Sequence, residues 1–227
     1  MNRTVITLAS VAVACGAAVM ISMAQPASPA SKPSGIPGYT YGTDKVAKSP
    51  LRMKDLDALK RSMLFTDEDI RFLRMSKPIL KDQTDAILDV WYGFVASTPE
   101  LVYFFGNKET GKPEAEYLAR VRARFGQWIL DTADGNFDQK WLDYQHEIAL
   151  RHHSTKKNQN DNAPSVPVIN YRYIPALTIP VTTTLKPFLA NKGASPADVD
   201  KMHAAWVKAV LLQAILWGEP YVRDGEF

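Results

Sequence analysis

The stretch that decides the fold is Trp141-Leu-Asp-Tyr-Gln-His-Glu-Ile-Ala-Leu-Arg-His-His153. Successive residues of a helix turn by about 100°. One face of this segment therefore carries Trp141, Gln145, Ile148, Ala149 and His152. The pattern predicts an amphipathic helix whose apolar face ends at an imidazole. A lone histidine on such a face is more often a hydrogen-bonded core residue than a ligand, so the helix alone leaves both roles open.

The spacing of the histidines limits the metal that they can hold. His146 and His153 lie about 10.5 Å apart along a helix, which is too far to share one zinc ion. His152 and His153 diverge by about 100° on a helix, so they cannot bind one ion together. What stays open is a single axial histidine for haem, a cofactor that brings its own metal and its other ligands.

A haem pocket also needs apolar walls and a polar group opposite the histidine. Trp91 and Tyr92 offer a large shield and a phenol that can donate a hydrogen bond, although such residues are more often core aromatics. The sequence holds no glycine-rich phosphate loop and no Gly-x-Ser-x-Gly turn. A His-Glu-x-x-His motif is also absent, because Leu150 stands where its second histidine would be.

The other segments of the chain predict further helices. Ser195-Pro-Ala-Asp198 is the strongest start signal, and Thr66-Asp-Glu-Asp69 is a similar one. Tyr171–Ala190 contains three prolines, which a central strand does not tolerate, so we expect a kinked helix there. The expected helices are 51–63, 66 to a break at Pro78, 79–96, 98–105, 114–130, 137–153, 171–190 and 195–217. The predicted fold class is all-α.

The N-terminal segment reads as a targeting sequence. Residues 1–24 hold one positive charge followed by an uncharged apolar run, which is typical of a signal peptide or an N-terminal membrane anchor. Cleaved export is the first interpretation, a membrane anchor the second, and lipidation at Cys15 the third. Residues 25–37 are rich in proline, alanine and serine and predict a flexible linker. The domain at 38–227 is then expected in the periplasm or another extracytoplasmic space.

Composition excludes several classes of function. Cys15 is the single cysteine of the 227 residues, so the globular part has no disulfide, cysteine-bound zinc, iron–sulfur cluster or cysteine nucleophile. The net charge is +3, and no run of basic residues with interleaved aromatics occurs. The sequence therefore predicts no nucleic-acid partner.

Several long motifs closely resemble the protoglobins, which are single-domain relatives of the globin-coupled sensors. The similarity covers about residues 36–227. The motifs are Ile36-Pro-Gly-Tyr-Thr-Tyr-Gly42, Ile87-Leu-Asp-Val-Trp-Tyr-Gly-Phe94, Arg124-Phe-Gly-Gln-Trp-Ile-Leu-Asp131, Trp141-Leu-Asp-Tyr-Gln145, Leu150-Arg-His-His153, Lys156-Lys-Asn-Gln159 and Lys186-Pro-Phe-Leu189. This resemblance implies a globin-like helical sandwich with an extra N-terminal helix at 51–63.

The resemblance also implies a site and its ligands. His152 matches the proximal ligand of haem b (iron protoporphyrin IX), and Trp91 and Tyr92 match the distal pair. The residues that match other pocket-lining positions are Phe125, Leu177 and Val181. Leu177 and Val181 are smaller than the side chains typical of the family, and Pro175 is a further departure that puts the straightness of its helix in doubt.

The activity implied by the resemblance is reversible binding of O2, CO and NO, for gas binding or sensing. Two alternatives are a haem enzyme with peroxidase-like or NO-detoxifying activity, and a haem-free helical interaction protein. The family forms homodimers through its last two long helices. The expected seam here is the stripe of Val199, Met202, Trp206, Val210 and Trp217.

Overall fold

The computed structural model describes residues 35–227. The expected signal peptide or anchor at 1–24, and the expected linker up to residue 34, lie outside the described residues. Within 35–227 no β-strand forms, and only two isolated bridges occur. The long helices are α1 (Met53–Ser62), α2 (Asp67–Leu80), α3 (Thr84–Ala96), α5 (Ala115–Asp134), α6 (Gln139–His152), α8 (Thr178–Leu189) and α9 (Pro196–Leu216). The prediction of an all-α fold is confirmed.

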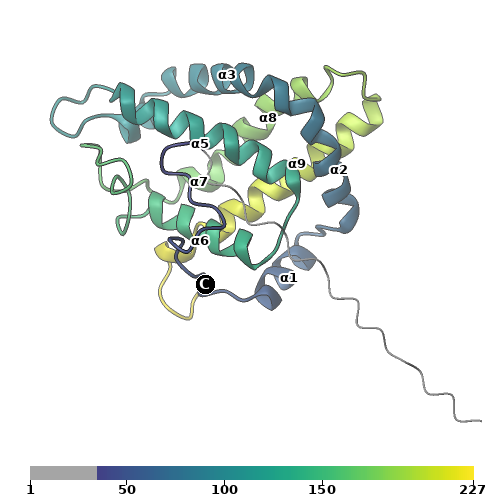
Figure 1. Cartoon of the computed structure of the whole chain (residues 1–227), viewed down its shortest axis with the longest axis horizontal. Coiled ribbons are helices and arrows are strands. Elements are labelled where there is room, and N and C mark those ends of the chain that lie inside the picture. The colour runs from purple at the N-terminus through teal and green to yellow at the C-terminus, as the bar shows by residue number, and fades with distance from the viewer. Residues whose placement is uncertain (1–34) are drawn as a thin grey trace, which may run out of the picture. The chain divides into compact units, whose positions relative to one another are not determined.

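Helix α9 is the centre of the packing. It contacts α2, α6 and α8, while α3 packs on α5 and α8 (Figure 1). The single-turn helices α4 (Pro99–Val102) and α7 (Tyr173–Ala176) connect the longer ones. None of the helices in the described part is both long and apolar enough to cross a bilayer.

The two start signals predicted from the sequence are confirmed. Thr66 and Asp69 form a capping box at the start of α2, and Ser195 Oγ accepts from the Asp198 amide at 3.1 Å at the start of α9. Helix α6, which carries His152, begins at a cap that the sequence patterns did not single out: Asp138 Oδ1 accepts a hydrogen bond from the Trp141 amide at 2.8 Å.

The predicted break at Pro78 is wrong. Helix α2 continues through Pro78 to Leu80, and the interruption is the 3-10 turn Lys81–Gln83. Proline removes one amide donor, but Ile79 and Leu80 are 7% and 0% exposed, and burial of these side chains favours the helical path. The kinked helix predicted at 171–190 is present as α7 and α8, with Leu177 between them.

The predicted dimer seam on α9 is also wrong for the residues that we expected. Val199, Met202, Trp206 and Val210 are at most 8% exposed and lie in the hydrophobic core of the chain itself. Trp217 packs on the same core. The stripe is apolar because it packs against the neighbouring helices of its own fold, so it is not available to a second copy.

Candidate functional site

A deep cavity of about 270 Å³ lies between the helices and has predominantly apolar walls. Its lining includes all six residues that the sequence singled out, which are Trp91, Tyr92, Phe125, His152, Leu177 and Val181. These residues come from α3, α5, α6, α8 and the junction before α8. The fold therefore brings the predicted site residues to one cavity.

His152 lies at the last position of α6, and its ring is held by its own helix. Nδ1 lies 2.8 Å from the carbonyl oxygen of Ile148, one turn earlier. A carbonyl only accepts, so Nδ1 carries the proton and Nε2 keeps a lone pair. Burial lowers the pKa of His152, and Lys157 and Arg151 act in the same direction, while the bond to Ile148 opposes them. The ring is thus neutral at pH 7, the form that binds a metal.

His153, in contrast, turns away from the cavity. It leaves the helix with an extended backbone, and its Nδ1 lies 2.7 Å from the hydroxyl of Thr155. Its ring packs edge-on against Tyr221. Of the two adjacent histidines, only His152 lines the cavity.

A tryptophan and a glutamine fix the plane of the His152 ring. Trp217 stacks on it, with ring centroids 5.1 Å apart and planes 17° apart. Its Nε1 donates a hydrogen bond of 2.9 Å to Oε1 of Gln145, which is 2% exposed. This support was not predicted, because the apolar stripe of α9 was expected to place Trp217 in a dimer seam.

Aromatic rings form the wall contributed by α3 and α5. Trp91 packs edge-on against Phe125 at 5.7 Å, and Tyr92 packs on Phe105 at 6.5 Å. Burial raises the pKa of Tyr92. Its hydroxyl makes no hydrogen bond with any other residue of the described range. Tyr92 is therefore a neutral phenol, and its hydroxyl donates no hydrogen bond to the described residues.

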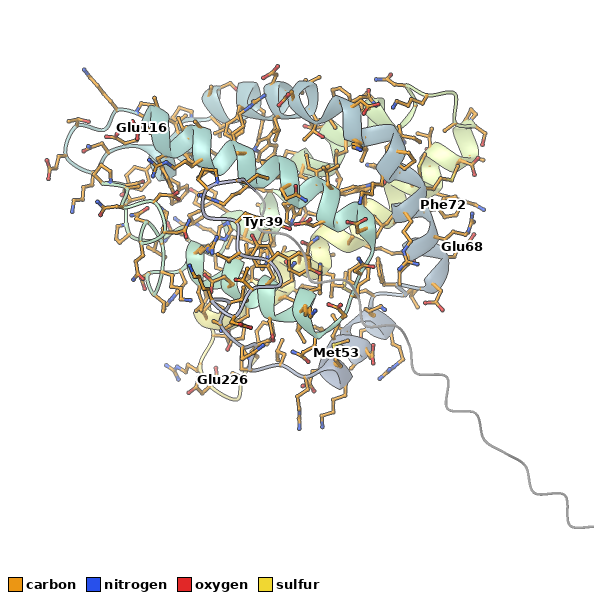
Figure 2. The ribbon with its side chains drawn as sticks, in the orientation of Figure 1. Tyr39, Met53, Glu68, Phe72, Glu116 and Glu226 are labelled. Atoms are coloured by element: carbon orange, nitrogen blue, oxygen red, sulfur yellow. The ribbon has the colours of Figure 1, made fainter. Side chains whose placement is uncertain are left out.

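The remaining end of the cavity is polar and is covered by residues 36–47, which we call the strap. Arg124 donates to the carbonyl of Pro37 at 2.9 Å, and Arg151 donates to that of Gly38 at 2.7 Å. Tyr39 lines the cavity. Figure 1 shows the strap as the dark purple segment between α5 and α6, and Figure 2 labels Tyr39 there. Among the described residues, Pro37, the last residue of the predicted linker, thus already contacts the fold.

The residues present fit a haem group. A neutral imidazole supplies one axial nitrogen, and apolar side chains line the cavity. At the polar end Arg124 is paired with Asp161, whereas Arg151 and Lys156 share Glu147 and so keep one net positive charge that matches a carboxylate. Within residues 35–227, no three His, Cys, Asp or Glu side chains gather as ligands for a metal ion. An all-α fold with a neutral histidine on an apolar cavity is the arrangement expected of a globin.

The comparisons with known proteins agree with this class. The protoglobin family model matches residues 52–227, so the chain belongs to the protoglobin family and is a haem globin. Its fold is similar to the globin domain of a globin-coupled sensor from Geobacter sulfurreducens. That match has a TM-score of 0.56 and 16% identity, and covers 74% of this chain and 97% of that one. The predicted globin-like fold is confirmed. No curated protein matches the sequence.

Proposed function

We infer that this protein binds haem b in the cavity, with His152 Nε2 as the axial ligand, and binds O2, CO and NO reversibly. When bound, haem supplies the iron that takes up the gas. The observation that carries the inference is the bond between His152 Nδ1 and the Ile148 carbonyl, because it leaves Nε2 as the free nitrogen of a ring that lines the cavity.

Other side chains of the cavity exclude water, bind the carboxylates of haem and donate a hydrogen bond to the gas. Trp91, Phe125 and Val181 exclude water from the apolar part. At the polar end, the one net positive charge that Arg151 and Lys156 keep around Glu147 would face the carboxylates of haem. Tyr92 donates a hydrogen bond to a polar diatomic molecule in the cavity.

The absorption spectrum tests the proposal. Purified protein supplied with haemin is expected to show a Soret band, and the reduced protein is expected to change its spectrum with CO. A protein that folds but gains no Soret band would overturn haem binding. A Soret band that does not respond to CO, O2 or NO would overturn gas binding alone.

Replacing Tyr92 with Phe tests the distal hydrogen bond. Such a bond contributes about 1–2 kcal/mol, so Tyr92→Phe is expected to speed dissociation of O2 by about 5–30-fold. CO carries less charge on its outer atom and is expected to dissociate nearly as before. The control is Tyr103→Phe, because Tyr103 is 61% exposed and does not line the cavity. Equal changes for the two gases would contradict the role of Tyr92.

A homodimer through the outer faces of α8 and α9 belongs to the same proposal. Lys186, near the end of α8, lies 3.0 Å from Asp200, near the start of α9, and Tyr171, which precedes α7 and α8, bonds to the carbonyl of Ala214 near the end of α9, so the two helices run antiparallel. Their outer surface carries Ile179 and Leu211, which are 65% and 36% exposed. Sedimentation should show a dimer that Ile179→Glu dissociates, and a monomeric wild type would contradict it.

We also propose that residues 1–24 export the protein or anchor it to a membrane, so that the globin domain works outside the cytoplasm. The apolar, uncharged run of this segment supports the proposal. N-terminal sequencing of protein from fractionated cells separates the cases. A mature chain that begins near residue 25 indicates cleavage, an intact chain in the membrane fraction indicates an anchor, and an intact chain in the cytoplasm would contradict both.

A further inference from the structure

Three tyrosines gather where the strap meets the cavity. Tyr39 and Tyr144 line the cavity. Their ring centroids are 5.6 Å apart, and Tyr41 packs on Tyr144 at 5.1 Å and on Tyr39 at 6.4 Å. Such a group of oxidisable phenols beside a cofactor cavity is not needed to bind a gas.

A carboxylate stands beside one of these phenols. The hydroxyl of Tyr39 donates to Oδ2 of Asp131 at 2.7 Å, and Gln127 donates to Oδ1 at 2.7 Å. No Lys, Arg or His among the described residues forms an ion pair with Asp131. Burial raises the pKa of Asp131 to about 6; Asp134 adds to the rise, while the two hydrogen bonds and Lys77 oppose it. At pH 7 Asp131 is therefore ionised, yet it takes up a proton more readily than an exposed aspartate.

Tyr39 itself does not ionise in this position. Burial strongly raises its pKa, and the negative charge of Asp131 raises it further. If the ring lost an electron alone, a positive charge would remain in a low-dielectric site, which is unfavourable. If the proton leaves with the electron, the ring stays neutral. Asp131 Oδ2 is the base placed to receive that proton.

We propose that Tyr39 is a redox-active residue that gives an electron to an oxidised haem in the cavity and its phenolic proton to Asp131. The proposal rests on the proposed function, because haem must occupy the cavity. The oxidant is a hydroperoxide such as hydrogen peroxide, which becomes two molecules of water by taking two electrons from the haem protein and two protons from solvent. Tyr39 supplies one of these electrons, and an external reductant of the ascorbate or phenol class supplies the other.

The atoms and electrons of the step balance. The O–H bond of Tyr39 breaks, one electron passes to the oxidised haem, and the proton forms a new O–H bond on Asp131. A neutral tyrosyl radical remains. One electron from a reductant of the ascorbate or phenol class, together with the proton held by Asp131, restores the phenol. Tyr39 thus directs oxidising equivalents to the strap, away from His152 and the aromatic wall of α3 and α5.

Electron paramagnetic resonance on rapidly frozen samples tests the proposal. Haem-loaded protein mixed with hydrogen peroxide is expected to give a tyrosyl radical signal. Tyr39→Phe is expected to remove most of that signal. Asp131→Asn, which keeps a hydrogen-bond acceptor but takes no proton, is expected to slow radical formation several-fold. Tyr103→Phe is the control and should match the wild type.

The Soret band of each variant is recorded first, so that failure to load haem is distinguished from failure of the relay. A normal Soret band with an unchanged radical signal in Tyr39→Phe would overturn the role of Tyr39. Unchanged kinetics in Asp131→Asn would overturn the role of its carboxylate. If Tyr39→Phe does not load haem, the solvent deuterium isotope effect on radical formation decides, because it should be present in the wild type and absent in Asp131→Asn.

Discussion

At one end of the cavity His152 is held by a carbonyl four residues away, and at the other end Tyr39 is held by a carboxylate 92 residues away. The first contact is made as soon as α6 forms. The second requires α5 and the strap to have come together, and it can open without unfolding a helix. The two ends should therefore respond differently to substitution, and four variants test this from the largest expected effect to the smallest.

His152→Ala is expected to have the largest effect, because no other side chain of the described range replaces the axial nitrogen. Haem loading should fall to a small fraction of the wild-type level, or the Soret band should shift to that of a different ligand. Titration with haemin measures both. His153→Ala is the matched control, since His153 bonds to Thr155 instead of lining the cavity. A normal spectrum in His152→Ala would move the ligand role to another residue.

Asp131→Asn tests the strap end through pH. The pKa of Asp131 is raised from 3.8 to about 6, so between those values the folded state holds a proton that the unfolded state has lost. The free energy of unfolding therefore decreases as pH rises through this window, by at most about 3 kcal/mol. The asparagine variant should lack this decrease and so gain stability relative to the wild type between pH 4 and pH 7.

Urea unfolding of the haem-free protein at several pH values measures the difference. Gln159→Leu is a suitable control, because its exposed side chain bonds only to the carbonyl of Thr155. Parallel pH profiles for the wild type and Asp131→Asn would contradict the raised pKa.

The comparison also explains what the sequence could predict. His152, Trp91, Tyr92, Phe125 and Val181 lie on helices whose faces follow from a fixed turn per residue, and motifs in those helices carried the resemblance. The sequence could therefore predict that these residues line one cavity. The role of each was implied by the family and not by geometry.

Contacts between segments that are distant in the sequence could not be predicted from sequence patterns. Lys157 follows another lysine in the polar motif Lys156-Lys-Asn-Gln159, a pattern typical of an exposed loop, yet it is 4% exposed and donates to carbonyls of Phe104 and Val166. Burial lowers its pKa to about 8. Trp217 looked like an interface residue because an apolar side chain packs equally well on its own fold or on a partner. No periodicity distinguishes these cases, since the difference lies in which helices meet.

Gly38→Ala tests how closely the strap must fit. Gly38 has a φ of +76°, and an added Cβ would lie 1.9 Å from Nδ2 of Asn160 and 2.7 Å from Nη1 of Arg124. The backbone conformation alone disfavours alanine by about 1–2 kcal/mol. We expect the strap to loosen and haem to dissociate faster, as measured by transfer to apomyoglobin. Gly35→Ala is the control, because nothing lies within 4 Å of its added Cβ. Equal rates in the two variants would mean that the strap does not retain haem.

Of the four variants, Gln145→Leu should have the smallest effect on haem binding, although it changes a contact beside His152. It removes the acceptor of Trp217 Nε1 and leaves that donor without a partner, which destabilises the fold by about 1–2 kcal/mol. His152 keeps its bond to Ile148, so the Soret band should stay in place. In Gln145→Leu/Trp217→Phe both partners are gone, and part of the lost stability should return. If Gln145→Leu instead released haem as readily as His152→Ala, the α6 end would depend on distant contacts as much as the strap does.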